Sequence, residues 1–159
     1  MAPRKSPQNS VGQPLANYLA AKRVGNLLYL SGVIAVNPAT RQIVNAYEDL
    51  PAQALRPLKA LGYVSGQVSV DVFEAPAVAQ SWFVLNRIRE LVELEGGQMK
   101  DVFKLVQYFR DLRHYPAYNR VRGLFCPDPV VSTVVEVSRL LPGDAVLIEV
   151  EATAYLPVH

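Results

Sequence analysis

Two carboxylates near the end of the chain have the spacing to act together on a small molecule. Glu149 and Glu151 lie two residues apart in residues 145–155, where apolar and polar residues alternate. Side chains of a strand alternate between its two faces. We therefore expect both carboxylates on one face, about 7 Å apart at about 3.3–3.4 Å per residue. Such a pair can act as general acid and base or orient a water molecule. A solvated sheet face explains the same pattern, and one strand does not separate these explanations.

The other reactive residue types have no partner that the sequence identifies. His114 stands in a predicted loop, and no motif assigns a serine or cysteine to it, while His159 is the last residue. The single cysteine, Cys126, follows two apolar residues and is interpreted as a small buried hydrophobe. No CxxC pair is present to bind zinc, and no GxGxxG or GxxxxGK loop is present to bind phosphate. The residues themselves predict a possible acidic site and no metal.

Hydrophobic periodicity predicts the elements that would position these residues. Prolines are expected to begin both helices, at a position where the missing N–H is tolerated. Residues 46–66 contain Pro51 and Pro57 and are interpreted as a loop with a short helical turn. The turn at residues 142–144 is predicted to join the last two strands as an antiparallel hairpin-like unit. The predicted strands are residues 27–30, 68–73, 103–109, 131–137 and 145–155, the predicted helices are residues 76–95 and 116–125, and residues 37–40 form a turn.

Length and composition predict one globular unit of the α+β class. The chain has 159 residues, of which 50% are hydrophobic and 19% charged, enough for a single domain with a buried core. Strands and helices are mixed, so we expect a mixed sheet with two helices on one face. Residues 1–14, rich in proline and small polar residues, are predicted to be a disordered arm. The single domain is predicted over residues 15–159.

Charge and hydropathy argue against several classes of protein. Arg4 and Lys5 account for the excess of 16 basic over 14 acidic residues, so the rest of the chain is balanced. A nucleic-acid-binding domain usually carries a basic face, so the balanced charge argues against a nucleic-acid partner. No run reaches the roughly 18 apolar residues of a membrane helix, and the first residues do not form a secretory signal. With one cysteine, a reducing cytoplasmic compartment is the expectation.

Several short motifs, in order along the chain, resemble the RidA/YjgF family. Each motif is weak alone, but their joint order and spacing cover residues 18–154 and are specific. The stretches that carry the resemblance are Asn17-Tyr18, residues 25–32 (GNLLYLSG), residues 37–40 (NPAT), residues 100–106 (KDVFKLV), residues 109–112 (FRDL), residues 118–121 (YNRV), Leu124-Phe125, Glu136-Val137 and residues 148–154 (IEVEATA).

The resemblance implies a fold, an assembly and a reaction. It implies a chorismate-mutase-like fold and a homotrimer whose small-molecule clefts lie between subunits. The best-known members hydrolyse reactive enamines and imines to keto acids and ammonia without cofactor or metal. By position, Tyr18, Gly32, Asn119 and Glu149 fall on site residues of the family. Glu149 would then hold and polarise the attacking water, and Tyr18 would close the cleft.

One departure from the family concerns a charged contact to the substrate. Deaminating members carry an arginine that grips the substrate carboxylate in a Pro-x-Arg-Ser/Thr pattern. Counting from Pro129 places Val131 at that position, whereas counting back from Glu136-Val137 places Ser132 there. Neither is a cation, and Arg139 is too far along the chain to substitute without a shift of register. Such bidentate pairs are strong contacts, so we expect a substrate other than simple 2-imino acids, such as a 2-aminomuconate-like enamine.

A second departure is an extra segment over about residues 48–68. It could reshape the mouth of the cleft and supply Arg56 or Lys59 to a ligand, or it could be a surface excursion, since loops tolerate insertions. Whether the protein is an enzyme stays open at this point. The alternative is a non-catalytic trimer that binds and senses a metabolite. Ribonuclease activity is disfavoured by the balanced charge and by the lack of a paired-histidine motif.

Overall fold

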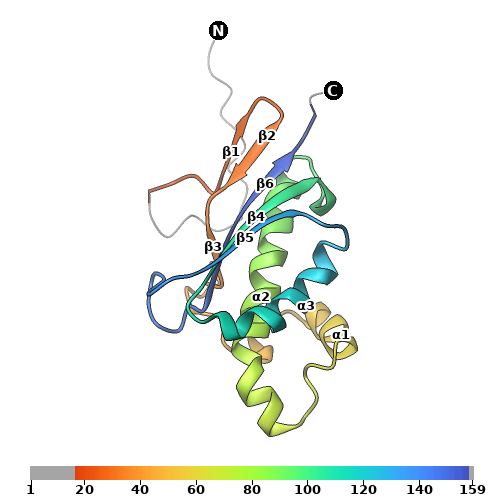
Figure 1. Cartoon of the computed structure of the whole chain (residues 1–159), viewed down its shortest axis with the longest axis vertical. Helices are drawn as coiled ribbons and strands as arrows, with labels where there is room; N and C mark the ends of the chain where they lie inside the picture. Colours follow the sequence, from red (N-terminus) through yellow and green to blue (C-terminus); the bar gives the residue numbers. More distant parts are fainter. Residues whose placement is uncertain (1–16, 158–159) are drawn as a thin grey trace.

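The computed structural model describes residues 17–157, so the predicted arm over residues 1–14 and His159 lie outside the described part. One mixed sheet has the strand order β1-β2-β6-β4-β5, with β3 paired to β6. The helices lie on one side of this sheet (Figure 1). Within residues 17–157, no helix is long and apolar enough to cross a membrane. The elements are β1 (Ala21–Val24), β2 (Leu27–Leu30), β3 (Val33–Ile34), α1 (Ala52–Ala60), α2 (Val68–Leu94), β4 (Val102–Phe109), α3 (Tyr115–Phe125), β5 (Val131–Glu136) and β6 (Ile148–Tyr155), with short 3-10 turns at Tyr47–Asp49, Met99–Asp101 and Leu112–His114.

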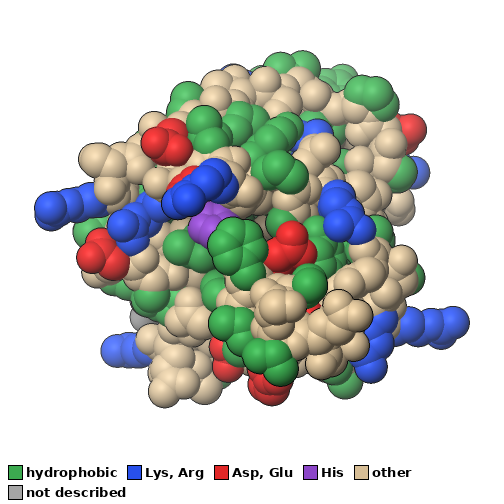
Figure 2. Space-filling model, turned by 60° about the horizontal axis from the view of Figure 1, so that its bottom comes forward, with side chains coloured by type: hydrophobic (Ala, Val, Ile, Leu, Met, Phe, Trp, Pro, Cys, Tyr) green, Lys and Arg blue, Asp and Glu red, His purple; other side chains and the backbone are tan. Residues whose placement is uncertain are grey.

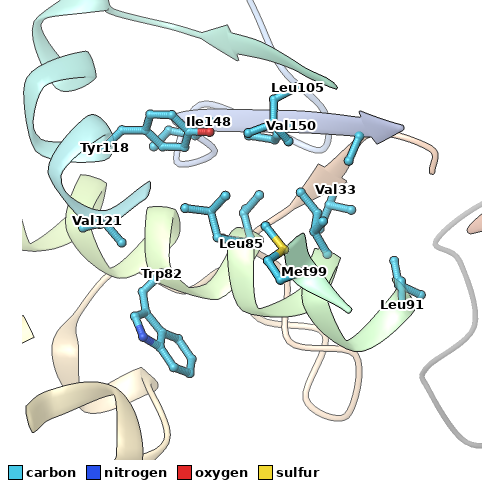
Figure 3. Close-up of a cluster of buried hydrophobic side chains, with 14 of the residues drawn as sticks. Val33, Trp82, Leu85, Leu91, Met99, Leu105, Tyr118, Val121, Ile148 and Val150 are labelled. Carbon is cyan, nitrogen blue, oxygen red and sulfur yellow. The ribbon is translucent and has the colours of Figure 1, made fainter. Parts of the chain in front are cut away.

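The hydrophobic core fills the space between α2, α3 and one face of the sheet. The residues of β6 alternate as predicted, with Ile148 and Val150 fully buried and Glu149 and Glu151 on the opposite face. Figure 3 shows Leu85 of α2 below Ile148 and Val150 of β6. This alternation fixes which face of the sheet each functional side chain occupies.

The other face of the sheet is not covered by any helix of residues 17–157, and we call it the open face. Residues paired across neighbouring strands point to the same side, so the register identifies its members. It carries Glu149 and Glu151 together with large apolar side chains that are 37–61% exposed. These apolar side chains are Val24, Tyr29, Val131, Val135 and Tyr155.

Two predictions about strands were wrong. The last two strands do not form a hairpin, because β4 lies between them, parallel to β5 and antiparallel to β6. The alternating valines at 68–73 are the first turns of α2, which begins eight residues before Pro76. Val68, Val72 and Phe73 are more than 70% exposed. No strand within the described part of the chain pairs with this segment. The Asp71 carboxylate accepts hydrogen bonds from the backbone N–H groups of Ser65 and Gly66.

The region interpreted as a loop contains a helix of nine residues, α1, despite its two prolines. Pro51 occupies the N-cap position, where a proline does not interrupt the helix, and Pro57 is tolerated inside it. The segment that follows is attached to α3. The Arg120 guanidinium donates a hydrogen bond to the Leu61 carbonyl and lies 4.8 Å from the centre of the Tyr63 ring. Leu61 and Tyr63, directly after α1, are therefore packed against α3.

Candidate functional site

Glu149 sits in the middle of the sheet, on the open face. Its register partners are Ile34 of β3 and Tyr108 of β4, so strands flank it on both sides. The carboxylate is half-buried, and this burial raises the pKa of Glu149 above its ordinary value, with a further contribution from the negative charge of Glu151. A carboxyl group whose pKa is raised toward the working pH is suited to accept and return a proton.

Gly32 provides the space that the Glu149 side chain occupies. A Cβ atom built on Gly32 would lie 2.0 Å from Oε1 of Glu149 and 2.9 Å from its carboxyl carbon. No other residue type fits here without displacing the carboxylate, because real Cβ atoms essentially never approach this closely. Two residues that the sequence placed in the site are therefore in direct contact.

Ser31 connects this pair to the segment that carries Tyr18. The Ser31 hydroxyl donates a hydrogen bond of 2.6 Å to the Leu19 carbonyl, and the Ser31 N–H donates one of 3.0 Å to the Ala20 carbonyl. These two hydrogen bonds hold the segment that follows Tyr18 beside the residue that precedes Gly32. The Tyr18 side chain is 45% exposed. Among the described residues, no hydrogen bond joins Tyr18 to Glu149. The structure thus brings the two segments together, while the contact between the two side chains stays a prediction.

Tyr108 and Glu151 extend the acidic site along the open face. Burial raises the pKa of Tyr108, and the charges of Glu151 and Glu149 raise it further. Tyr108 therefore stays a neutral phenol, which can donate its proton in a hydrogen bond. Sequence reasoning missed this residue. The sequence feature that could have identified Tyr108 is its position in the strand over residues 102–109. Tyr108 lies between two buried residues, so its side chain points to the opposite face of the sheet.

Val131 and Ser132, the two alternatives for the position of the family's arginine, point to opposite faces of β5. Val131 pairs with Lys104 on the open face, whereas Ser132 pairs with buried Leu105 on the helical side. The Ser132 hydroxyl accepts hydrogen bonds of 2.8 Å from Gln107 Nε2 and 3.3 Å from Arg122 Nη1. Of the two, only Val131 shares a face with Glu149.

Gln107 and Arg122 form a polar network that sequence reasoning also missed. Gln107 is fully buried, and it additionally donates to the Thr133 carbonyl at 2.9 Å and accepts from Arg122 at 3.2 Å. The network ties β4, β5 and α3 together on the helical side. The sequence feature that could have identified Gln107 is a glutamine among the apolar residues 105–109. It shares a face of the strand with Leu105 and Phe109, which are both buried.

One copy of the chain does not bring all the predicted site residues together. Val131 pairs with Lys104, which pairs with Thr153, four residues along β6 from Glu149. Val131 and Glu149 are therefore about 13 Å apart along the strands, and two strand spacings of about 4.8 Å apart across them. Asn119 is exposed on α3, in the helical layer, and among residues 17–157 no hydrogen bond joins it to Glu149.

The remaining candidate residues do not form a second reactive centre. His114 ends a 3-10 turn at the N-cap of α3, in which Asp111 accepts a hydrogen bond from the Arg113 N–H. Burial raises the pKa of the Cys126 thiol, which disfavours a reactive thiolate. Within the described part of the chain, no group of three or more metal-ligating side chains is present. In the view of Figure 2, basic side chains stand in separate groups among acidic and apolar ones.

Known proteins resemble this chain over most of its length. Residues 52–156 match the family model described as Endoribonuclease L-PSP. A RutC family protein of Pyrococcus abyssi is 31% identical over 144 residues, which cover 90% of this chain and 89% of that protein. A protein of Dermatophagoides farinae named 2-iminobutanoate/2-iminopropanoate deaminase is 30% identical, covering 77% of this chain and 74% of its own length. A 3-aminoacrylate deaminase RutC of Acinetobacter baylyi is 25% identical, with 90% of each chain covered.

Solved structures agree with the fold described above. A putative endoribonuclease from Klebsiella pneumoniae superimposes with a TM-score of 0.81 at 53% identity, covering 88% of this chain and all of that one. The RidA structure from an Antarctic Psychrobacter species has a TM-score of 0.68 at 22% identity, with 91% and 93% covered, and so supports the fold alone. The α+β class that the sequence predicted is confirmed. On the matched family model and these relatives, the chain belongs to the RidA/YjgF family, whose model bears the description Endoribonuclease L-PSP.

Proposed function

We propose that this protein is a cofactor-independent cytoplasmic deaminase that hydrolyses an enamine or imine metabolite other than a simple 2-imino acid. The observation that carries the proposal is Glu149, a half-buried carboxylate with a raised pKa that packs directly against the backbone of Gly32. The names of two relatives, a 2-iminobutanoate/2-iminopropanoate deaminase and a 3-aminoacrylate deaminase, support a reaction of this class.

Glu149 acts as the base and then as the acid in the proposed reaction. The carboxylate accepts a proton from water as the water oxygen bonds to the carbon of the protonated C=N group, whose π electrons move to nitrogen. Glu149 then returns the proton to nitrogen, the C–N bond breaks with its electron pair leaving on ammonia, and the hydroxyl becomes the new carbonyl as ammonia takes up its proton and leaves as ammonium. An enamine enters the same sequence after it takes up a proton at carbon, which converts it to the protonated C=N form. The net reaction consumes one water and releases ammonia. A proton donor and acceptor with a pKa near the working pH contributes typically 10²–10⁴ in rate.

The cleft is proposed to form between copies of the chain. Val131 and Glu149 lie on one face but are separated along β6 by four residues, so a single substrate cannot contact both in one copy. The open face presents exposed apolar side chains that a second copy would cover. Tyr18 of one copy would close a cleft that contains Val131, Asn119 and Glu149 from the two copies.

The absence of a cation at Val131 determines the proposed substrate class. A valine on the open face supplies no charge-assisted hydrogen bond to a carboxylate. A longer enamine of the 2-aminomuconate type, which can be held through other groups, is therefore preferred over a short 2-imino acid. Ser132 is committed to Gln107 and Arg122 on the other face, so we do not propose that it contacts the substrate.

Ammonia release is the measurement that tests this proposal. Candidate enamines and imines, generated in place by coupled enzymes, are offered to the wild-type protein and to the Glu149→Gln and Glu151→Gln variants. We expect Glu149→Gln to lower the rate by about 10²–10⁴ on the accepted substrate. Glu151→Gln is the matched control, because it removes a carboxylate from the same face. It should keep most of the rate and move the pH profile toward acid, since Glu151 contributes to the raised pKa of Glu149.

The alternative is a trimer that binds a metabolite without converting it. Binding of the same compounds without ammonia release, in the wild type and in both variants, would support that alternative. Equal rates for the wild type and Glu149→Gln would contradict the role given to Glu149.

A further inference from the structure

A cavity of about 420 Å³ lies on the helical side of the molecule, away from the open face. Figure 3 shows Trp82 on the side of α2 that faces away from the sheet. The cavity is about the size of a small-ligand site and is largely apolar, as such sites usually are. Its lining residues are Gln53 and Pro57 of α1, Trp82 and Arg89 of α2, Met99, and Leu124 and Phe125 of α3.

Two aromatic side chains form one wall. The rings of Trp82 and Phe125 meet edge to face, with centroids 6.0 Å apart and planes at 66°. Trp82 is 4% exposed, so the pair is already held in place by the protein. Aromatic walls of this kind favour flat apolar groups, which can stack or meet them edge-on.

Among the described residues that line the cavity, Arg89 alone is charged, and a neighbouring side chain fixes its guanidinium. Nη2 donates a short hydrogen bond of 2.5 Å to Oδ1 of Asn86, a side chain that is itself buried. The Nε atom of Arg89 is buried and has no hydrogen-bond partner among residues 17–157. Glu93 lies 3.9 Å from Nε, too far for a hydrogen bond, and both side chains are substantially exposed, so solvent weakens this pair. The guanidinium thus retains donors for a further acceptor.

We propose that this cavity binds a small monocarboxylate with a flat aromatic body. The aromatic group would lie among Trp82, Phe125 and Met99, and the carboxylate would accept hydrogen bonds from Arg89. A guanidinium recognises a carboxylate by planar, charge-assisted hydrogen bonds, which a neutral amide of the same shape does not reproduce. The proposal is independent of the deaminase function, because the cavity contains none of the residues around Glu149.

Trp82 is the single tryptophan of the chain, so its fluorescence reports binding at this cavity. The probes are phenylacetate and its neutral counterpart, phenylacetamide. We expect a saturable change of tryptophan fluorescence with phenylacetate, and weaker binding of the amide by about tenfold or more. Glu149→Gln should leave both affinities unchanged, which separates this cavity from the proposed catalytic site.

Arg89→Gln tests the role of the charge, with Arg87→Gln as the matched control on the same helix. Arg87 is paired with Glu90 at 3.2 Å and is not part of the lining. Arg89→Gln should weaken phenylacetate by about tenfold or more and leave the amide within about twofold, while Arg87→Gln should change neither. Arg89→Lys keeps the positive charge, so it should bind phenylacetate more tightly than phenylacetamide, with a smaller difference than the wild type. This variant tests the charge even if Arg89→Gln disturbs folding. No saturable signal, or equal affinity for the acid and the amide, would overturn the proposal.

Discussion

At the scale of single residues, Glu149, the proposed base, is held half-buried at a cost in stability. Burial and the charge of Glu151 both disfavour the ionised carboxylate. Because Gly32 has no side chain, this carboxylate can pack against its backbone instead of turning toward water. The site therefore depends on a residue that has no side chain of its own.

The Gly32→Ala variant should displace the Glu149 carboxylate. The added Cβ would lie 2.0 Å from Oε1, so the side chain must rotate away, where it gains water. We expect the pKa of Glu149 to fall toward its ordinary value and the rate on an accepted substrate to fall with it. A carboxyl titration followed by NMR and a rate measurement check this. Gly143→Ala is the control, since its Cβ would meet nothing within 4 Å. An unchanged pKa in Gly32→Ala would be incompatible with the close contact.

The Glu149→Gln variant should be more stable than the wild type at neutral pH. The raised pKa means that the folded state holds the proton more tightly than the unfolded state, where the ordinary value is 4.5. The stability that Glu149 contributes is complete below that value and is lost as the pH rises through its folded pKa. Urea unfolding at pH 7 and below pH 4.5 should show a gain for the variant that shrinks in acid. A gain that is the same at both pH values would show that the carboxylate is not destabilised by burial.

At the scale of elements, β5 decides which of two neighbouring residues can reach the open face. Val131 and Ser132 differ by one position, and side chains of a strand alternate between its faces. The helical face is already occupied, because Gln107 and Arg122 donate hydrogen bonds to the Ser132 hydroxyl. A cation placed at each position in turn therefore separates the two alignments that the sequence left open.

Val131→Arg should increase activity toward a simple 2-imino acid, and Ser132→Arg should not. Arginine at 131 would extend from the face that carries Glu149, whereas arginine at 132 would lie beside Arg122 and remove the hydroxyl that accepts hydrogen bonds from Gln107 and Arg122. We expect kcat/KM for 2-iminopropanoate to rise by about tenfold or more in Val131→Arg, a change of about 1.4 kcal/mol. Equal rates in the two variants would mean that the face of β5 does not control this contact. High activity of the wild type on this substrate would contradict the proposed substrate class.

At the scale of the whole molecule, the open face is a sheet surface that no helix of residues 17–157 covers. A sheet is stabilised when its apolar face packs against another layer. Here the helices cover one face, and the other exposes Tyr29, Val131 and Tyr155, among others, beside the acidic site. Self-association would cover these side chains and complete the cleft in one step.

We expect the protein to form a trimer in solution. Light scattering should give about three times the chain mass of 17.6 kDa. The Val135→Glu variant should have a lower mass. Val135 lies on the open face, where Tyr108 stands between it and Glu149. The added charge would lie among apolar side chains and near two existing carboxylates. Leu141→Glu is the control, because Leu141 is 82% exposed and lies outside the sheet. A wild-type mass near that of one chain would contradict both the trimer and the cleft proposed between copies.

The sequence by itself determined the features that depend on local periodicity and on ordered motifs. The alternation of β6 predicted that Glu149 and Glu151 share a face, and hydrophobic periodicity predicted a helix over residues 76–95, which lie almost entirely in α2. The motif order identified the family. These predictions hold because the period of a strand (2), the period of a helix (3.6) and a short motif can all be recognised from residues close together in the sequence.

Only the tertiary structure decided the features that depend on distant partners. The valines at 68–73 alternate like a strand, but they lie beyond the sheet and continue a helix, because no neighbouring strand is there to pair with them. The last two strands are consecutive in sequence, yet β4 lies between them. The contact of Gly32 with Glu149, and the faces of β5 on which Val131 and Ser132 lie, follow from strand pairing between residues far apart in the chain. Local propensity carries no information about such pairing, because a strand acquires its neighbours only when the whole sheet assembles.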